Sequence, residues 1–329
     1  MTRSIRLAAL TAVTSLTAGV LCLPGAAYAA DITTTLTAAQ MVTALKSVAA
    51  TSTTAAGDGW KITEALKGPN GSASGEYVFD PAAGVVYEHS ELDSRGGAQY
   101  LVHHKGTYQS LSTVERAAVK MMNRPAVRYS FRSDTTSDFD HYVDAKGARP
   151  AKIVTDDSNH PGTRTTHDDG SADYSFAPDE DVTITYAVGP TGVLTEAKAT
   201  MPSLSLTLTL TVTYGAEHVT LPPASATVNS VVLARGVAYV GMPTTVKQVA
   251  ADGAAAARRA AGGHTVKASA VRKALRSLAS AANRRAGSAM VRVEDVAGGA
   301  RVHATNPWTH QTVAYTVKAS GSKAVIRRA

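Results

Sequence analysis

The chain has 329 residues, of which 44% are hydrophobic and 18% are charged, and its formal net charge is +7. This length allows one large or two modest domains, and the composition excludes a disordered tail and a membrane-embedded chain. The single cysteine, Cys22, lies in the N-terminal leader. The rest of the chain therefore has no disulfide, no thiolate nucleophile and no cysteine-ligated metal.

Residues 1–29 have the features of a secretory signal peptide. Two arginines precede an apolar stretch at residues 7–23, and Ala27-Tyr28-Ala29 matches the small-residue pattern of a cleavage site. The alternative is an uncleaved anchor helix, but threonine, serine and proline interrupt the stretch. A leucine before Cys22 is a poor match to a lipid-anchoring site. We therefore expect an exported protein that begins at Ala30 and keeps no transmembrane segment after cleavage.

The next part of the chain predicts two helices separated by strands. Residues 37–50 place apolar side chains at helical spacing after the N-cap residue Thr37. Residues 112–123 form the second predicted helix, which Ser112 and Glu115 begin as a capping box. Strand patterns lie between the helices at residues 60–66, 76–79, 85–88, 100–104 and 107–111.

The pattern then changes to that of antiparallel strands. Residues 133–181 are rich in Asp, Gly, Ser and Thr, which predicts loops and short strands. Residues 204–214 alternate aliphatic with hydroxyl-bearing side chains, as in a strand buried on one face. Further strands are predicted at residues 182–186, 194–201 and, as an edge strand, 219–221. We expect an α+β fold, with a curved antiparallel half-barrel sheet covered by helices around an apolar cavity.

The region from residue 247 to the end differs from the body in charge. It contains 15 Lys and Arg residues but 3 Asp and Glu residues, a net charge of +12, whereas residues 30–246 have a net charge of −7. Helices are predicted at residues 245–261 and 269–286, with Gly287 as a C-cap, and strands at 290–296, 300–305, 312–317 and 323–327. We therefore divide the chain into a signal peptide at 1–29, a body at 30–246 and a smaller basic helix-and-strand region at 247–329.

Three segments of the body resemble the LolA/LppX-like superfamily of bacterial lipoprotein and lipid carriers. They are Gly75-Glu-Tyr77-Val-Phe79-Asp80-Pro81, the hairpin Tyr186-Ala-Val188-Gly-Pro-Thr-Gly192-Val-Leu194, and the closing pattern Val212-Thr-Tyr214-Gly215-Ala-Glu-His-Val219-Thr-Leu221-Pro222-Pro223. The resemblance covers about residues 35–230. It implies a half-barrel closed by helices that holds acyl chains between sheet and helices. The basic end lies outside the pattern of that family.

An aliphatic cavity can hold an acyl chain without catalytic residues, because each buried methylene contributes about 0.8 kcal/mol. We expect the lining to come from the alternating strand, the first strand after the first helix, and the second helix: Leu204, Leu206, Leu208, Leu210, Val212, Trp60, Ile62, Val114 and Met121. The alternative is that these side chains fill a solid core.

The last predicted helix has basic residues around a narrow apolar stripe. We expect it to contact an anionic envelope surface through Arg272, Lys273, Arg276, Arg284 and Arg285. Two alternatives are a solvated basic face and pairing with the acidic body of the same chain. The apolar stripe is too small for strong membrane insertion, and nucleic acid is not an expected partner of an exported protein.

No catalytic or cofactor motif stands out in the sequence. Adjacent His103 and His104 on a strand would point to opposite faces and could not chelate one ion together. His167-Asp168-Asp169 lacks the spacing of a calcium loop or zinc helix. Ser320-Gly-Ser-Lys323 matches S-x-x-K, but its glycine favours a turn over the helix that this chemistry needs. We expect no enzyme activity, no cofactor and no metal.

The leading hypothesis is an exported carrier of a lipid or an acylated protein. The alternative is a non-catalytic cell-surface or secreted protein-interaction module with a filled core. A hydrolase whose site the sequence does not reveal is a third hypothesis. A continuous cavity distinguishes the first from the second, and a nucleophile or an acid pair in a cleft would favour the third.

Overall fold

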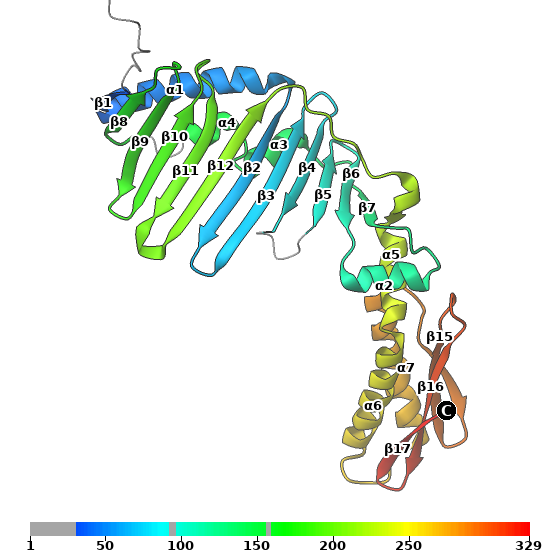
Figure 1. Cartoon of the computed structure of the whole chain (residues 1–329). Coiled ribbons are helices and arrows are strands. Elements are labelled where there is room, and N and C mark those ends of the chain that lie inside the picture. Colours follow the sequence, from blue (N-terminus) through cyan, green and yellow to red (C-terminus); the bar gives the residue numbers. More distant parts are fainter. Residues whose placement is uncertain (1–30, 92–96, 156–158) are drawn as a thin grey trace, which may run out of the picture.

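The computed structural model describes residues 31–91, 97–155 and 159–329 and contains two separate β-sheets (Figure 1). The larger sheet has 13 strands in the order β1-β8-β9-β10-β11-β12-β2-β3-β4-β5-β6-β7-β13, and the smaller has 4. Neighbouring strands are antiparallel except β13 and β7, and β1 and β13 are free edges, so the large sheet is not closed into a barrel. The expected α+β class is confirmed. The predicted signal peptide and Cys22 lie outside the described residues.

The body contains all strands of the large sheet and four α-helices. The strands are β1 (Ile32–Leu36), β2 (Trp60–Gly68), β3 (Gly71–Asp80), β4 (Val85–Ser90), β5 (Ala98–Val102), β6 (Gly106–Ser110), β7 (Tyr129–Ser133), β8 (Gly162–Thr166), β9 (Ala172–Asp179), β10 (Val182–Val188), β11 (Leu194–Met201), β12 (Leu206–Tyr214) and β13 (Thr227–Asn229). The helices are α1 (Ala38–Ala55), α2 (Thr113–Met121), α3 (Phe139–Ala145) and α4 (Pro150–Thr155), with 3₁₀ turns η1 (Ala56–Asp58), η2 (Pro202–Leu204) and η3 (Ala224–Ala226).

The first predicted helix is confirmed as α1, and its cap is the predicted one. The Thr37 hydroxyl accepts a bond from the Gln40 amide at 3.3 Å, while the Gln40 side chain accepts one from the Thr37 amide at 2.9 Å. Helix α1 buries Met41 and Leu45 completely against the sheet. The capping box of Ser112 is confirmed in the same way at the start of α2.

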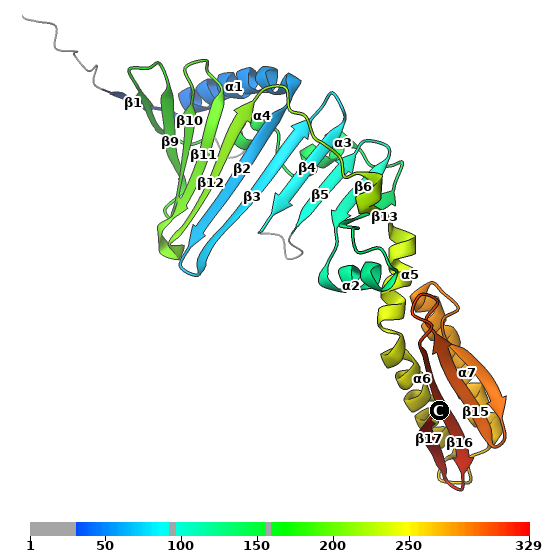
Figure 2. The same ribbon diagram turned by 45° about the vertical axis from the view of Figure 1, so that its right-hand side comes forward.

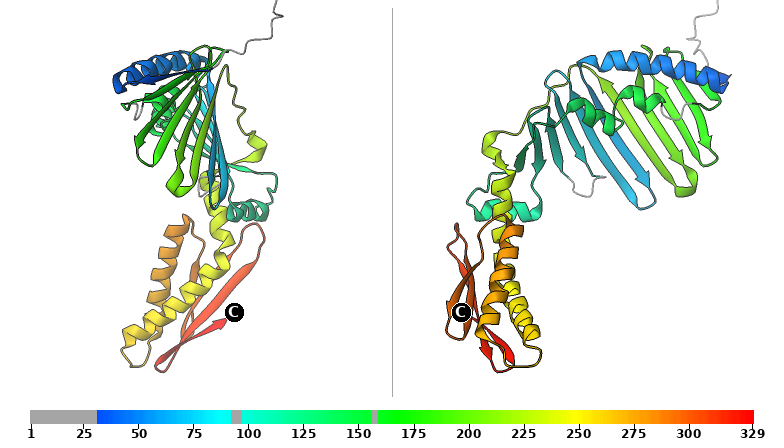
Figure 3. Two further views of the ribbon diagram at one scale, coloured as in Figure 1. Left: turned by 60° about the vertical axis from the view of Figure 1, so that its left-hand side comes forward. Right: turned by 180° about the vertical axis from the view of Figure 1, so that it is seen from behind.

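Helices α1, α3 and α4 lie on one face of the large sheet and toward one end of its strands, as the rear view in Figure 3 shows. We call this side the helix face. Trp60 stacks on Phe79 at a ring separation of 4.5 Å, meets Phe139 of α3 edge-on at 6.4 Å, and donates its indole N–H to the Ala148 carbonyl at 3.1 Å. Ile62 of β2 and Val212 of β12 pair directly across the two strands, and both side chains are buried in this core.

The short strands β8 and β9 confirm part of the prediction for residues 133–181, and helices α3 and α4 correct the rest. Asp138 caps α3 by accepting a bond from the His141 amide at 2.7 Å, and the helix buries Phe139 and Val143. The two helices have 7 and 6 residues. Segments of fewer than two turns are too short for helical periodicity, which is detected over windows of about 11–18 residues.

Helix α2 was expected to cover the sheet, and this is wrong. It packs against α5 (Ser230–Val240) instead, where Ala118 and Leu233 belong to a separate small core. Helices α2 and α5 approach each other closely at Gly236 of α5, where a Cβ atom would lie 2.4 Å from the sulfur of Met122 at the end of α2. This core joins the body to the C-terminal part of the chain.

The edge strand predicted at residues 219–221 is also wrong. The segment between β12 and η3 carries no strand pairing, and the Val219 amide donates to the buried Asp80 carboxylate at 3.4 Å. Two consecutive prolines follow at Pro222 and Pro223, and proline has no amide hydrogen to donate to a neighbouring strand.

The C-terminal part is a second α/β unit, which we call the basic module (Figure 2). It comprises α6 (Met242–Ala261), α7 (Ala268–Ala286), β14 (Arg292–Val296), β15 (Gly299–Thr305), β16 (Thr312–Ser320) and β17 (Lys323–Arg328). Both helices pack on its sheet around Val246, Leu275 and Val302, each fully buried. Gly287 ends α7 with φ of 57°, the left-handed C-cap that the sequence predicts. The expected boundary at 246/247 lies inside α6, whose Met242 and Val246 already belong to the module core.

Candidate functional site

A row of apolar side chains crosses the helix face beyond the end of the strands that the helices cover. It runs through Ala73 of β3, Leu66 of β2, Leu208 of β12, Ala199 of β11 and Ile184 of β10, and each residue pairs with the next. All five are half-buried, although Leu66, Leu208, Ala199 and Ile184 each have strand neighbours on both sides. We call these residues the apolar row. Together with Leu206, they form an apolar part of the helix face at the end of the strands that the described helices leave uncovered.

A small cleft lies where the apolar row meets the helices. Its volume is about 150 Å³, and its lining comes from β2, β3, β12 and the segment around α4: Ile62, Glu64, Tyr77, Lys146, Gly147, Ala148, Ile153, Leu208 and Leu210. One side of the cleft is aliphatic, through Leu208, Leu210 and Ile153. The other side presents a carboxylate, a phenol and an ammonium group, so the cleft is amphipathic.

The polar side of the cleft is a connected group of side chains. Glu88 is 7% exposed and accepts bonds from the Tyr142 hydroxyl and from Lys146 Nζ, the latter at 2.9 Å. The Tyr77 hydroxyl donates to Glu64 Oε2 at 3.2 Å. Burial, with Glu64 and Glu88 nearby, raises the pKa of Tyr77 to about 12, so this phenol is a neutral hydrogen-bond donor near neutral pH.

Sequence reasoning missed this polar group. Tyr77 and Glu88 pair directly across β3 and β4, but Tyr142 and Lys146 reach them only because α3 lies on the same face. The group ties α3 to the sheet.

Six of the predicted lining residues lie on the helix face. Trp60, Ile62 and Val212 are buried in the core at the covered end, and Leu206, Leu208 and Leu210 are half-buried along β12. Ile62, Leu208 and Leu210 line the cleft. The alternation of β12 therefore places its leucines on the face of the sheet that carries the helices.

The other three predicted lining residues lie elsewhere, and this corrects the expectation. Leu204 belongs to the turn η2 and is 59% exposed, because the strand begins two residues later, at Leu206. Val114 is 53% exposed on α2, and the Met121 sulfur accepts a bond from the Asn306 side chain at 2.9 Å. Both are far from the helix face because α2 packs at the junction with the basic module.

The predicted basic contacts all lie on α7, and they differ in their environment. Arg272 donates to the carbonyls of Gly299 and Val296, and Arg276 pairs with Asp295 at 2.8 Å. These two arginines hold the turn between β14 and β15. Lys273 and Arg285 are exposed, and Arg284 bonds to the Ser280 hydroxyl on its own helix. Among the described residues, no ion pair joins the body to the basic module.

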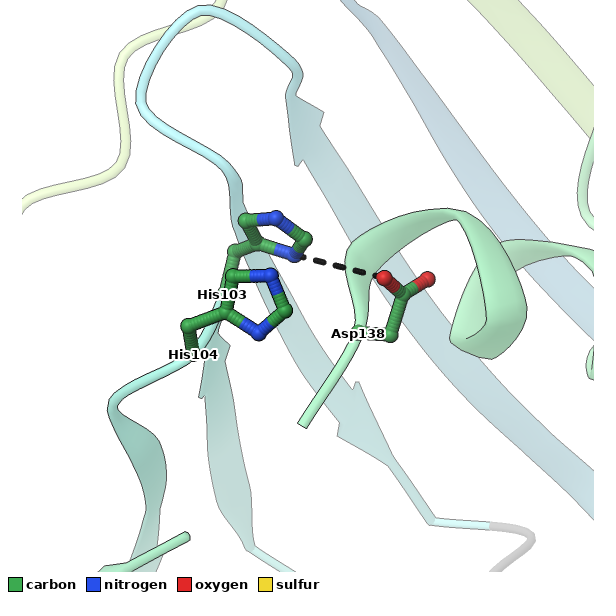
Figure 4. A group of neighbouring side chains, drawn as sticks. All are labelled: His103, His104 and Asp138. Carbon is green, nitrogen blue, oxygen red and sulfur yellow. Dashed lines mark ion pairs between the residues drawn. The ribbon is translucent and has the colours of Figure 1, made fainter. Parts of the chain in front are cut away.

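His103 and His104 do not point to opposite faces, which corrects another expectation. They lie in the turn between β5 and β6 and not on a strand, and His104 has a φ of 54°. This left-handed conformation brings the two rings to a centroid separation of 3.8 Å, beside Asp138 (Figure 4). The alternation rule for strands does not hold in a turn.

The two remaining sequence patterns, around His167 and around Ser320, lie at a strand end and in a turn. His167 contacts the carboxylates of Asp31 and Asp173 at 3.0 and 3.3 Å, and the bonds to Asp31 and Asp173 raise its pKa. Ser320 and Lys323 face each other across the turn between β16 and β17, where Gly321 has a φ of 56°. This is the turn that the sequence favours.

No helix within the described residues has both the length and the apolar character needed to cross a membrane. No family model matches the chain, and no curated protein matches it either. The resemblance to LolA/LppX-like carriers therefore rests on the three sequence segments alone and enters the functional argument as a hypothesis.

Proposed function

We propose that this protein is an exported carrier that binds the acyl chains of a lipid or an acylated protein on the helix face of its large sheet. In this proposal the sheet and its helices form a half-barrel. The observation that carries the proposal is the apolar row, which crosses five strands, stays half-buried and leads directly into the cleft.

The dimensions of the row suit an extended chain. Neighbouring strands lie about 4.8 Å apart, so five strands span roughly 19 Å. Burying ten methylenes would contribute about 8 kcal/mol, which corresponds to a dissociation constant near the micromolar range. The polar side of the cleft, with Glu64, Tyr77 and Lys146, supplies donors and acceptors for the head group or ester.

The volume of the cleft sets a condition on the mechanism. At about 150 Å³ it holds a group the size of benzene, whereas sites for whole ligands usually occupy about 300–1,000 Å³. Entry of a complete acyl chain into the cleft therefore requires α3 and α4 to move away from the sheet. The two helices have 7 and 6 residues, and such movement would break the bonds from Tyr142 and Lys146 to Glu88.

The same volume favours the second candidate, a protein-interaction module with a filled core. Trp60, Phe79 and Phe139 fill the covered end of the helix face. In that case the apolar row contacts a protein partner, and no acyl chain enters between sheet and helices.

Extraction of the purified protein from its native host separates the two candidates. Mass spectrometry of the organic extract would find an acyl lipid in stoichiometric amount under the carrier proposal. A clean extract, together with no response of a fluorescent fatty acid, would contradict it and favour the interaction module.

Two neighbouring positions on β12 give a matched pair of variants. Leu208→Gln places an amide in the apolar row, and Thr209→Gln places the same side chain on the opposite face of the same strand. Losing the burial of one leucine costs about 1.5–3 kcal/mol, so Leu208→Gln should weaken fatty-acid binding about 10- to 100-fold, with Thr209→Gln unchanged. Equal affinities of the two variants would contradict the proposed site.

The basic module gives the proposed carrier a second contact. Its net charge of +12 from residue 247 onward, with Lys273 and Arg285 exposed on α7, suits an anionic polymer or lipid head group. In this proposal the module docks at the envelope surface and the body holds the cargo.

A further inference from the structure

His103, His104 and Asp138 bring three metal-ligating groups together on the body. One ligand atom from each residue lies within 4.8 Å of the other two, and Figure 4 shows both rings and the carboxylate converging. His103 Nδ1 and Asp138 Oδ2 are 3.7 Å apart. Ligands of a tetrahedral ion at about 2.0–2.1 Å stand roughly 3.4 Å apart, so only small movements separate this arrangement from a coordination sphere.

The backbone holds the three residues firmly in place. The His103 amide donates to the Gly84 carbonyl at 2.9 Å, and the His104 amide donates to the Ser137 carbonyl at 2.8 Å. The buried Ser137 hydroxyl also donates to the Val102 carbonyl at 2.9 Å. These bonds fix the turn between β5 and β6 against the start of α3, which provides the preorganisation that a metal site needs.

The hydrogen bonds leave acceptor atoms facing one another. His104 Nδ1 lies 3.1 Å from the Thr135 carbonyl, which can only accept, so Nδ1 carries the proton and Nε2 has a free lone pair. His103 Nδ1 accepts from the Phe139 amide at 3.1 Å, so this nitrogen carries no proton and its one lone pair is engaged with that amide. A histidine whose second nitrogen donates to a backbone carbonyl is the usual arrangement of a metal ligand.

The carboxylate completes the set with a negative charge. Asp138 Oδ1 accepts the capping bond from His141, which leaves Oδ2 available to a cation. His104 Nε2 and Asp138 Oδ2 are acceptor atoms, and His103 Nδ1 becomes a third when it exchanges the Phe139 amide for a cation.

We propose that His103, His104 and Asp138 bind a divalent transition-metal ion, with Zn²⁺ as the best match. Two imidazoles and one carboxylate are borderline ligands that suit zinc better than calcium or magnesium, which prefer oxygen atoms. Binding replaces the Phe139 amide at His103 Nδ1 with the metal ion. A tetrahedral ion with three protein ligands keeps one position for water or for a group from a partner.

This site is independent of the acyl-binding proposal. The ion would tie the turn between β5 and β6 to the N-terminal end of α3, the helix that also carries Tyr142 at the cleft. The metal therefore connects a surface site to the position of a helix on the sheet, whatever the cargo is.

Isothermal titration of the untagged protein with ZnCl₂ tests the proposal, and Co²⁺ absorption reports the coordination geometry. We expect one ion per chain and a visible Co²⁺ band of tetrahedral intensity. His104→Ala and Asp138→Asn should each weaken binding at least about tenfold, while His89→Ala, an exposed histidine on β4 outside the cluster, should leave it unchanged.

Asp138→Asn is the decisive variant, because asparagine caps a helix as well as aspartate does and leaves α3 intact. Circular dichroism and thermal unfolding without metal should therefore match those of the native chain. No Zn²⁺ binding, or equal Zn²⁺ affinity in the native chain, His104→Ala and Asp138→Asn, would overturn the proposal.

Discussion

The body and the basic module are both sheets with helices on one face, but they differ in how far the helices extend. In the module, α6 and α7 bury Leu275, Val302 and Val317 completely. In the body, α1, α3 and α4 cover one end of the long strands, and the apolar row stays half-buried at the other (Figure 3). The core of the module is fully buried, whereas the helix face of the body carries apolar side chains that its helices do not cover. A site for an apolar ligand is therefore expected in the body and not in the module.

The largest expected effect is on stability. Leu275→Ala should lower the free energy of unfolding of the basic module by about 2.7–5 kcal/mol, because the deleted atoms leave a cavity between α6, α7 and the sheet. Leu208→Ala in the apolar row should cost about 1 kcal/mol, because its side chain is half-buried. Urea unfolding measures both changes. Similar losses for the two variants would show that the apolar row is as closed as the module core.

A smaller effect is expected on surface binding by the module. Replacing Lys273 and Arg285 by glutamine should weaken binding to phosphatidylglycerol vesicles by about 2 kcal/mol at low salt, since each basic residue near an anionic surface contributes about 1 kcal/mol. Vesicle co-sedimentation measures this change, and raising the salt concentration should reduce it. Lys61→Gln and Lys67→Gln in the body form the matched control. An equal loss from the control pair would assign the charge contact to the body.

The smallest expected effect concerns β1, the edge strand of the large sheet in the body. Interaction with Asp31 and Asp173 raises the pKa of His167 above 6.5. A raised pKa in the folded state stabilises the fold below the unfolded pKa, and this contribution disappears as pH rises through the folded value. Protection of the β1 amides from hydrogen exchange should therefore be slightly higher near pH 6 than near pH 8. His167→Gln should remove this difference, and a difference that persists in the variant would assign it to another group.

Much of the fold follows from local sequence signals. Capping boxes at Thr37 and Ser112, the alternation of β12 and the glycine at the end of α7 each specify local structure through contacts within a few residues. All four strands of the basic module were predicted with ends within three residues of those observed, and Gly298 and Gly321 mark two of the turns between them.

The remaining features depend on contacts between distant segments. The position of α2 is decided by Leu233, which lies more than one hundred residues further along the chain, and no periodicity in residues 112–123 indicates it. The polar group at Glu88 and the convergence of His103 with Asp138 likewise require α3 to lie against the sheet. Half of the candidate cleft was predictable, namely the aliphatic side from β12, and the polar side was not.

The central claim is that the acyl chain lies along the apolar row, and photo-crosslinking tests it most directly. A fatty acid with a diazirine near its chain end would be bound, irradiated and mapped by peptide mass spectrometry. The carrier proposal predicts labels on peptides from β2, β3 and β10 to β12, with loss of labelling in Leu208→Gln and not in Thr209→Gln. Labels concentrated on the basic module, or spread evenly over the chain in both variants, would contradict it.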